Sequence, residues 1–418
     1  MEQAIVLIFI ILFVGRAVWR YRLDWLNVSH LRQHGKIIPP VFQGVIDENT
    51  LDKMVDYTID NTRLAEKEHI AGDILELAIL FLFLPFFVSA VIGWHMHFIW
   101  QALIFFGILA IISGAAGLPF NLYHTFVLEK KYGFSTITWR LWFADLAKTI
   151  IISAILMGIV ISALMTFIHY LPRGWWFWAW LFFVTFEIVL LWLYPVVIAP
   201  LFNKFEPLKD EALQEQIVNL MAKAGLTAKG IFQVDEGKRS RHTNAYFTGI
   251  GKTKRIVLYD TLLASHTHDE ILAVLAHEIG HWKKKHIVKQ LMFMMAASLV
   301  LLYFIHGAVT GPHLYRAFGL AETPVYAGLF LVSLYLGAVS FFLNPIGAAV
   351  MRRYEREADA MAYELTGTAE PLINALKRLA KDNLANLHPH PLYVIFYYSH
   401  PPLLERIEKL QTMDSRTQ

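Results

Sequence analysis

The sequence predicts a mainly α-helical integral membrane protein with seven spans and a polar α/β part outside the bilayer. Of the 418 residues, 56% are hydrophobic and only 17% are charged, whereas soluble domains contain about a quarter charged residues. The mean hydropathy is +0.45. Seven stretches are apolar enough to cross the membrane, since a span takes ~20 helical residues for ~30 Å of hydrocarbon. The polar residues are concentrated in two long segments.

The first span begins almost at the N-terminus, where residues 4–14 are apolar and Arg16, Arg20 and Arg22 follow. A cleaved signal peptide carries its positive charge before the apolar run, so we interpret this stretch as a retained span ending at about Trp19. The other six spans are expected near residues 74–94, 97–118, 149–171, 175–197, 288–308 and 325–346. The aromatic run at 175–180 is expected to face lipid or the membrane interface.

Loop charges predict the orientation. The connections expected on one side carry few positive charges: none at 95–97, Arg173 between the fourth and fifth spans, and Arg316 between the sixth and seventh. The other side holds the loops at 16–67 and 130–140, which are rich in Lys and Arg. Because cytoplasmic loops carry the excess of these residues, we expect the N-terminus outside and the C-terminus in the cytosol.

The spans divide the chain into four parts. Residues 1–202 would hold spans one to five, 203–286 a first cytosolic segment, 287–349 spans six and seven, and 350–418 a second cytosolic segment. Neither polar segment has enough apolar residues for its own core, so the two are expected to form one domain. Within them, apolar periodicity predicts the following elements: helices at 210–224, 350–386 and 403–411, strands at 230–234 and 255–259 with a possible third at 244–247, and a Pro-rich loop at 389–402.

Composition also limits the chemistry. The chain has no cysteine, which excludes disulfides and thiolate catalysis and leaves His and carboxylates to hold any zinc ion. The net charge of +3 is small for this length, so nucleic acid is not expected as a partner.

The stretch 269–285, DEILAVLAHEIGHWKKK, carries the strongest signal for chemistry. Its apolar residues recur at helical spacing, and His277 and His281 lie four residues apart on one face. Two such imidazoles can bind one Zn²⁺, and Glu278 is placed to act on water at the metal, whose pKa zinc lowers towards ~7. The pattern therefore predicts a metalloprotease, although a five-residue match in a chain with 18 histidines can be accidental.

A third ligand is expected from the helical stretch 351–365, because catalytic zinc sites use three protein ligands and one open position. We assign Glu355 to the metal and Asp359, four residues later on the same face, to a hydrogen bond with a ligand histidine. Glu357 is the nearest alternative, but it lies about 200° round the helix from Glu355. A solvated charged helix end is the other interpretation of this stretch.

Other histidines are expected to be structural. His266, His268 and His286 flank the HEIGH helix and are interpreted as solvated. His388 and His390 lie in the Pro-containing loop, where a role at the rim of the site stays open.

Longer motifs resemble a known family, the type I CAAX prenyl proteases, which are integral-membrane zinc metalloproteases that process prenylated proteins. The matching segments occur in order along most of the chain: LEKKYGFSTIT at 128–138, YPVVIAPLFNKFEPL at 194–208, RHTNAYFTGIGKTKRIVLYDTLL at 241–263, HEIGHW at 277–282, RRYEREADAMA at 352–362 and SHPPLLERI at 399–407.

The resemblance implies a seven-helix fold that encloses an intramembrane chamber, closed at its cytosolic end by a gluzincin-type zinc domain. It implies one Zn²⁺ per chain, with His277, His281 and Glu355 as ligands and Glu278 as the base. His400 would contact the substrate or the developing oxyanion.

The resemblance also implies an edge strand that pairs with extended substrate, on which Asn244, Ala245 and Tyr246 would lie. The characteristic reaction of the family removes the last three residues from a C-terminal prenylated Cys-a-a-X sequence. The lipid bilayer and a prenylated or hydrophobic peptide are the expected partners, and no obligate protein partner is evident.

The compact spacing of the motifs and the lack of a lysine-rich tail favour a bacterial inner-membrane protein, which would rather degrade misfolded or hydrophobic membrane proteins. A eukaryotic chain would lie in the endoplasmic reticulum.

Two other functions remain as alternatives. An intramembrane protease would place the His motif inside a span, but here the motif is followed by Lys283, Lys284 and Lys285, and each charge costs about 2.5–3.5 kcal/mol at a span centre. A metal-binding transporter would need ionisable residues within its spans, of which Glu187 is the main candidate. A hydrogen bond between helices is the simpler interpretation of Glu187.

Overall fold

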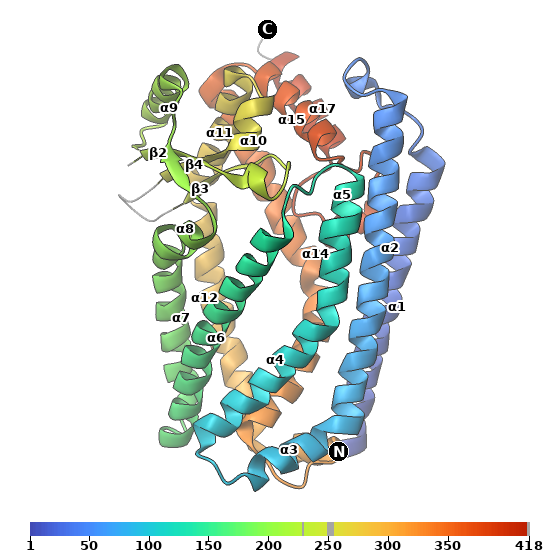
Figure 1. The fold of residues 1–418 in the computed structure, drawn as a ribbon, viewed down its shortest axis with the longest axis vertical. Helices are drawn as coiled ribbons and strands as arrows, with labels where there is room; N and C mark the ends of the chain where they lie inside the picture. Colours follow the sequence, from blue (N-terminus) through green and yellow to red (C-terminus); the bar gives the residue numbers. More distant parts are fainter. Residues whose placement is uncertain (228–229, 249–254, 416–418) are drawn as a thin grey trace.

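The computed structural model describes residues 1–227, 230–248 and 255–415. Within this part of the chain, seven helices are long and apolar enough to cross a membrane, which confirms the predicted number of spans. They run along the long axis of the molecule, and a mixed α/β part, here called the head, covers one end of them (Figure 1). The N-terminus lies at the opposite end (Figure 1).

The spanning helices are continuous or joined by π-helical turns. Their bounds are α1 (Glu2–His34), α2 (Glu48–Ala78) continuing through Ile79–Phe83 into α3 (Leu84–Gly93), α4 (Phe98–Tyr123) continuing through His124–Leu128 into α5 (Glu129–Lys131), α6 (Trp139–Tyr170), α7 (Trp175–Leu193) continuing through Tyr194–Ile198 into α8 (Ala199–Phe202), α12 (His286–Thr310) and α14 (Val325–Thr366). The short helix α13 (Pro312–Ala317) connects the last two.

The helices extend well beyond the predicted spans. Residues 16–67 were expected to form a loop, which is wrong, because α1 runs on to His34 and α2 begins at Glu48. Apolar residues mark only the part of a helix that lies in hydrocarbon, whereas the backbone hydrogen bonds can continue into the aqueous phase. Arg16 on α1 pairs with Asp73 on α2 at 3.2 Å, which neutralises charge between the two helices.

The seventh span and the stretch with the expected third ligand form one helix, α14, of 42 residues. A domain boundary at residue 350 therefore falls inside a continuous helix. The helix ends at Gly367, whose positive φ of 75° closes it with a left-handed cap. The predicted helix at 350–386 is consequently two helices rather than one.

The head contains a four-stranded sheet with the order β1-β2-β4-β3. The strands are β1 (Phe205–Pro207), β2 (Gly230–Val234), β3 (Ala245–Thr248) and β4 (Arg255–Tyr259), with β2 and β4 parallel and the outer pairs antiparallel. The helices of the head are α9 (Glu211–Lys223), α10 (Asp260–Ser265), α11 (His268–Lys283), α15 (Glu370–Asp382), α16 (Pro391–Tyr397) and α17 (Leu403–Ser415), together with the end of α14.

Five predicted elements of the head are confirmed, the helices at 210–224 and 403–411 and the strands at 230–234, 244–247 and 255–259. Strand β1 was missed because it is only three residues long. The segment 389–402 was expected to be a loop, which is wrong for its middle, since α16 lies there. Pro391 is the first residue of that helix, a position that proline favours because the N–H it lacks would be unsatisfied anyway.

Two hydrophobic cores lie at the two ends of the molecule. The head core includes Ile217, Ile256, Leu275 and Ile407, so residues of both polar segments share it. The second core lies at the far end of the helices, and it contains Trp175, which is 2% exposed rather than lipid-facing as expected.

Between the two cores lie hollows of about 600 Å³ and 330 Å³, bordered by α2, α4 and parts of α14 and the 383–398 segment. They share the lining residues Glu68 and Phe120.

Candidate active site

Helix α11 is positioned by its N-terminus and by its buried face. Thr267 caps the helix in a reciprocal arrangement with Glu270, in which each side chain accepts a hydrogen bond from the backbone of the other. Arg378 of α15 holds Glu270 at 3.1 Å. On the buried face, Leu275 and Ile279 are fully enclosed in the head core. The HEIGH sequence therefore lies on a helix fixed at its start and along one side.

Gly280 brings α11 against α14. A Cβ atom at this position would lie 2.9 Å from both the Cα and the carbonyl oxygen of Ala358, which is closer than atoms pack. The absence of a side chain lets the two helices approach at the level where His277 and His281 face Glu355. Glycine inside a helix normally destabilises it by about 1 kcal/mol, so its use here reflects this close approach.

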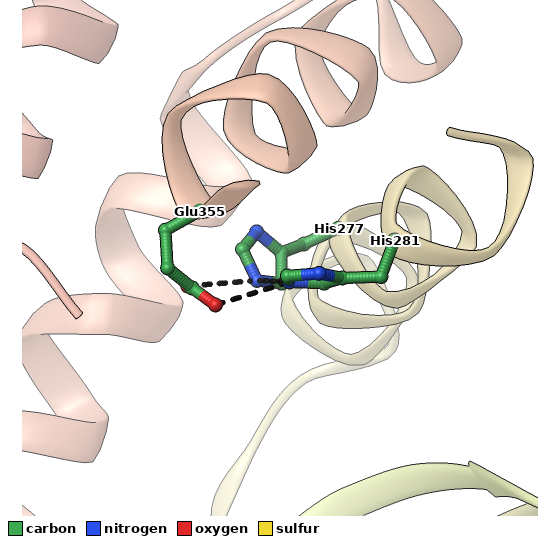
Figure 2. Close-up of side chains that lie close together, drawn as sticks. All are labelled: His277, His281 and Glu355. Carbon is green, nitrogen blue, oxygen red and sulfur yellow. Dashed lines mark hydrogen bonds and ion pairs between the residues drawn. The ribbon is translucent and has the colours of Figure 1, made fainter. Parts of the chain in front are cut away.

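His277, His281 and Glu355 converge on one point (Figure 2). The Nε2 atoms of the two histidines are 3.2 Å apart, and they lie 3.3 Å and 3.1 Å from the two carboxylate oxygens of Glu355. Ligands bound at about 2.0–2.1 Å in a tetrahedral arrangement are about 3.3–3.4 Å apart. The spacing thus fits a tetrahedral ion such as Zn²⁺ with one position left open.

The surroundings of Glu355 also fit a cation. Its side chain is almost fully buried, and Oε2 has no hydrogen-bond donor among the described residues. A buried carboxylate oxygen without a donor is unfavourable unless a cation is bound to it. Burial disfavours the charged ring of His277, but the nearby carboxylates of Asp359 and Glu355 outweigh this effect and raise its pKa to about 9. The site therefore attracts positive charge, which a proton or a metal ion can supply.

Asp359 holds the outer nitrogen of His277, with Oδ1 at 2.8 Å from Nδ1. Arg406 of α17, which sequence reasoning missed, holds Asp359 in turn through two hydrogen bonds of 2.9 Å and 2.7 Å. It is 8% exposed, and its Nη1 lies 3.9 Å from Glu355. This bidentate pair fixes the orientation of the Asp359 carboxylate and hence of the His277 ring.

His281 has a longer chain of partners. Its Nδ1 lies 3.1 Å from Nδ1 of His286, whose Nε2 lies 3.1 Å from Glu357. The His286 ring is 1% exposed and stacks on Tyr354 at 4.1 Å. The prediction that His286 is solvated is therefore wrong. Glu357, the alternative third ligand, contacts His286 and is not one of the three converging ligands. His266, also expected to be solvated, is 7% exposed.

Glu278 follows His277 on α11, and His400 borders the cluster beside Glu355. Burial raises the pKa of Glu278, which brings a general base closer to neutrality. His400 is exposed, with Nε2 at 3.3 Å from Glu355 and Nδ1 at 2.9 Å from the Ser399 hydroxyl. Arg352 of α14 donates to the carbonyl oxygens of Val394 and Tyr398, at 3.0 Å and 2.8 Å, and so ties the segment before His400 to the helix that carries Glu355.

Strand β3 forms one edge of the sheet. The Tyr259 N–H donates to the carbonyl of Asn244, and in an antiparallel pair the bonded residues alternate. Ala245 and Phe247 therefore direct their backbone groups away from β4, and the Ala245 N–H is taken by the Asn244 side chain. The Phe247 ring packs 5.5 Å from Trp282, directly after the HEIGH residues. The edge thus lies beside α11.

The expected substrate-binding residues occupy different places on this edge. Asn244 precedes the strand, Ala245 is buried at its start, and the Tyr246 side chain lines a hollow of about 490 Å³ together with Tyr259 and Phe202. Residues 249–254 of the 241–263 motif lie outside the described residues.

Sequence reasoning found the cluster and the hydrogen bond of Asp359 to a ligand histidine, but not the other residues that support them. A lone Arg406, Arg352 or His286 carries no local pattern, since each acts on a residue at least five positions away in sequence. The only available signal was that Arg352 and Arg406 fall within the family-like segments at 352–362 and 399–407.

Comparisons with known proteins agree with this geometry. Residues 27–204 match a family model described as CAAX prenyl protease N-terminal, five membrane helices, and residues 207–414 match peptidase family M48. CAAX prenyl protease 1 of Saccharomyces cerevisiae is 33% identical over 421 residues, covering 92% of each chain. The Homo sapiens homolog is 31% identical over 428 residues, covering 90% of this chain and 89% of the homolog.

A solved structure shows the same fold. The crystal structure of S. mikatae Ste24p superposes with a TM-score of 0.90 and 31% identity, covering 97% of this chain and 98% of that one. The chain therefore belongs to peptidase family M48, as a multi-span membrane metalloprotease of the CAAX prenyl protease type.

Proposed function

We propose that this protein is a zinc endopeptidase that removes the C-terminal tripeptide from prenylated Cys-a-a-X substrates. The observation that carries the proposal is the convergence of three ligand atoms at tetrahedral spacing, beside the free edge of β3. His277, His281 and Glu355 would hold one Zn²⁺, and Asp359 would orient His277. The substrate class is inferred from the relatives, which are CAAX prenyl proteases.

Bound zinc supplies Lewis acidity, which polarises the scissile carbonyl and lowers the pKa of a water molecule towards ~7. Glu278 would take a proton from the attacking water and deliver it to the leaving amine. His400 would donate from Nε2 to the carbonyl oxygen as negative charge develops there. Arg352 and Ser399 would keep His400 in place for this step.

The substrate would lie along β3 as an additional strand. Phe247 offers an outward N–H and C=O, and Ala245 an outward C=O, which are the groups that an extended peptide pairs with. The hollow of about 330 Å³ along α2, α4 and α14, lined mostly by apolar residues such as Leu75, Ile79 and Phe330, offers surface for a prenyl chain, whose burial contributes ~0.8 kcal/mol per methylene.

The site lies outside the hydrocarbon layer in this proposal. Glu355 follows Val325, the first residue of α14, by 30 positions, which corresponds to a rise of about 45 Å along the helix, compared with a hydrocarbon thickness of ~30 Å. This distance disfavours an intramembrane protease. The excess of Lys and Arg in the loops on the side of the head supports a cytosolic head and an N-terminus outside.

A transporter is disfavoured by the distribution of ionisable groups. Glu187, the main candidate for an ion path, forms no hydrogen bond or ion pair with any described residue, so the expected bond between helices is not present. No set of three converging His and carboxylate groups other than the one around Glu355 is found among the described residues.

The test is cleavage of a farnesylated Cys-a-a-X peptide by purified protein, beside a chelator-treated sample and the same peptide without the farnesyl group. Cleavage only of the farnesylated peptide, lost with chelator and restored by Zn²⁺, is the expected result. Equal cleavage of both peptides would support the quality-control alternative instead. Absence of cleavage in a zinc-loaded sample with both peptides would overturn the proposal.

The edge strand gives a first prediction. Phe247→Pro removes the outward N–H without breaking the hydrogen bonds to β4. It is expected to raise KM by about 2–10-fold, because the substrate loses one backbone hydrogen bond. Phe247→Ala is the matched control, because it removes the same ring but keeps the N–H. Peptide kinetics should therefore show a higher KM for the proline variant than for the alanine variant; equal values would argue against strand addition.

The second prediction concerns His286. Its replacement by alanine removes the partner of His281 Nδ1 and is expected to weaken zinc binding by about 10–100-fold. Competition with a chromogenic chelator measures this change. His268→Ala is the control, since His268 lies on α11, the helix that carries His281, but pairs with Asp210 at the surface. An unchanged zinc affinity in the His286 variant would show that His281 needs no such support.

A further inference from the structure

The chain enters strand β3, the proposed substrate edge, through a half-buried histidine, His242. Its ring stacks on Phe134, with the ring centroids 4.0 Å apart. Its carbonyl oxygen accepts a hydrogen bond of 2.8 Å from the Thr261 hydroxyl of α10. Both ring nitrogens also have partners, which come from elements that are distant in sequence. The backbone that leads into β3 is therefore held through this one residue.

One ring nitrogen of His242 faces the end of α15. Nδ1 lies 2.9 Å from Oδ1 of Asn383, the residue that follows this helix. The same oxygen accepts a hydrogen bond of 3.3 Å from the Thr243 N–H, and the Asn383 amide nitrogen donates to the Thr243 hydroxyl at 3.3 Å. Because the Thr243 N–H can only donate, the atom that faces it must be the oxygen of the Asn383 amide. His242 consequently donates from Nδ1.

The other ring nitrogen of His242 faces the cytosolic end of the third span. Nε2 lies 3.2 Å from Oε2 of Glu129 on α5, which continues that span. Glu129 is 8% exposed, and its Oε1 accepts a hydrogen bond of 2.6 Å from the Tyr57 hydroxyl of α2. His124, on the π-helical turn before α5, lies farther away, with Nε2 at 3.6 Å from Oε1. Tyr57 and His124 are thus the titratable neighbours of the His242–Glu129 pair.

The two hydrogen bonds of the His242 ring require a proton between the ring and Glu129. A neutral ring that donates from Nδ1 has a lone pair at Nε2, and this lone pair would face a carboxylate oxygen, which also only accepts. A proton on either His242 Nε2 or Glu129 Oε2 supplies the missing hydrogen bond. Burial disfavours the charged ring, but the hydrogen bonds with Glu129 and Asn383 outweigh this effect and raise the pKa of His242 above its ordinary value.

We propose that His242 and Glu129 are positioning residues for substrate binding, which hold β3 in its binding orientation only while they share this proton. The pair joins the start of β3 to the third span, and Tyr57 extends the connection to α2. The inference rests on the proposed function only in taking β3 as the substrate edge.

The expected pH dependence follows from the direction of the shift. A group whose pKa is raised in the folded protein contributes its stabilisation at low and neutral pH and loses it as the pH rises through the raised pKa. Above that pH the lone pair of His242 faces the Glu129 carboxylate, and the repulsion separates the segment before Asn244 from α5. The binding orientation of β3 is therefore lost at alkaline pH.

Glu129→Gln distinguishes this pair from an ordinary structural contact. The glutamine amide can donate from its nitrogen to Nε2 of a neutral His242 and still accept from Tyr57 at its oxygen. A fixed N–H then replaces the titratable proton, so β3 should keep its orientation at every pH. Glu129→Ala removes the partner and should loosen β3 at every pH. His124→Gln changes the other histidine beside Glu129 and should keep the pH dependence of the wild-type protein.

The test is quenched-flow hydrogen–deuterium exchange of the full-length protein, followed at the backbone amides of residues 243–248. Variants are compared with wild-type protein at the same pH, which cancels the intrinsic pH dependence of exchange. At neutral pH, wild-type protein and Glu129→Gln should exchange equally and Glu129→Ala faster. At alkaline pH, the wild-type protein should exchange about 2–30-fold faster than Glu129→Gln, the range expected for coupling through neighbouring residues.

Peptide kinetics give a second readout. The wild-type KM should rise at alkaline pH relative to that of Glu129→Gln, while kcat stays equal, because Glu278 and His400 are the same in both proteins. Equal exchange and parallel KM profiles for the two proteins at all pH values would overturn the proposal, and so would wild-type exchange in Glu129→Ala. The exchange measurement needs no substrate, so a failure of peptide cleavage would contradict the proposed function and leave this test decisive.

Discussion

Replacement of Glu278 by glutamine is expected to lower kcat by about 10²–10⁴-fold, the usual contribution of a general base, while zinc remains bound. The amide has nearly the shape of the carboxylate but cannot accept a proton from water. Glu278 lies next to a proposed ligand without being one, and burial already raises its pKa. Peptide kinetics together with the zinc content of the purified variant measure the effect.

The control for this prediction is Glu364→Gln, which changes an exposed glutamate of α14 in the same chemical way. It should leave both kcat and zinc content unchanged. A Glu278 variant that retained wild-type kcat would show that another group accepts the proton. A variant that lost its zinc would instead place Glu278 in the metal coordination.

The second large effect is expected at Gly280. Alanine favours a helix by about 1 kcal/mol over glycine, so Gly280→Ala would stabilise α11 if nothing opposed the added methyl group. The backbone of Ala358 opposes it, because the new Cβ would lie 2.9 Å from two of its atoms. Overpacking of this kind costs about 1–3 kcal/mol and must push α11 and α14 apart.

Separation of the two helices moves Glu355 away from His277 and His281. A misplacement of about 1 Å can cost about 10²-fold in rate, so Gly280→Ala is expected to lose most of its activity and part of its zinc affinity. Gly347→Ala is the matched control, since that residue also lies in α14 but has open space at its Cβ. Thermal unfolding should show the Gly280 variant less stable and the Gly347 variant unchanged or slightly more stable.

Much of this protein could be predicted from local pattern. The number of spans follows from apolar length, because only helices that satisfy their own backbone can cross lipid. The metal cluster follows from the four-residue spacing of His277 and His281, and from the same spacing of Glu355 and Asp359, which puts each pair on one face of a helix. Residues four apart on a helix share a face in any fold, so both inferences hold without tertiary information.

Other features depended on packing between distant segments. His266 and His286 were expected to be solvated because they flank the HEIGH helix, yet both are buried. Arg406 reaches Asp359 across 47 positions, and no local rule connects them. The length of α14 beyond its apolar part likewise could not be predicted from hydropathy.

By itself the sequence determined the membrane class, the spans and the chemical identity of the cluster, because each of these rests on the composition or period of a single segment. Only the tertiary structure decided how close α11 comes to α14 and which groups hold the ligand histidines. The physical reason is that these contacts join residues whose separation in sequence carries no information on their separation in space.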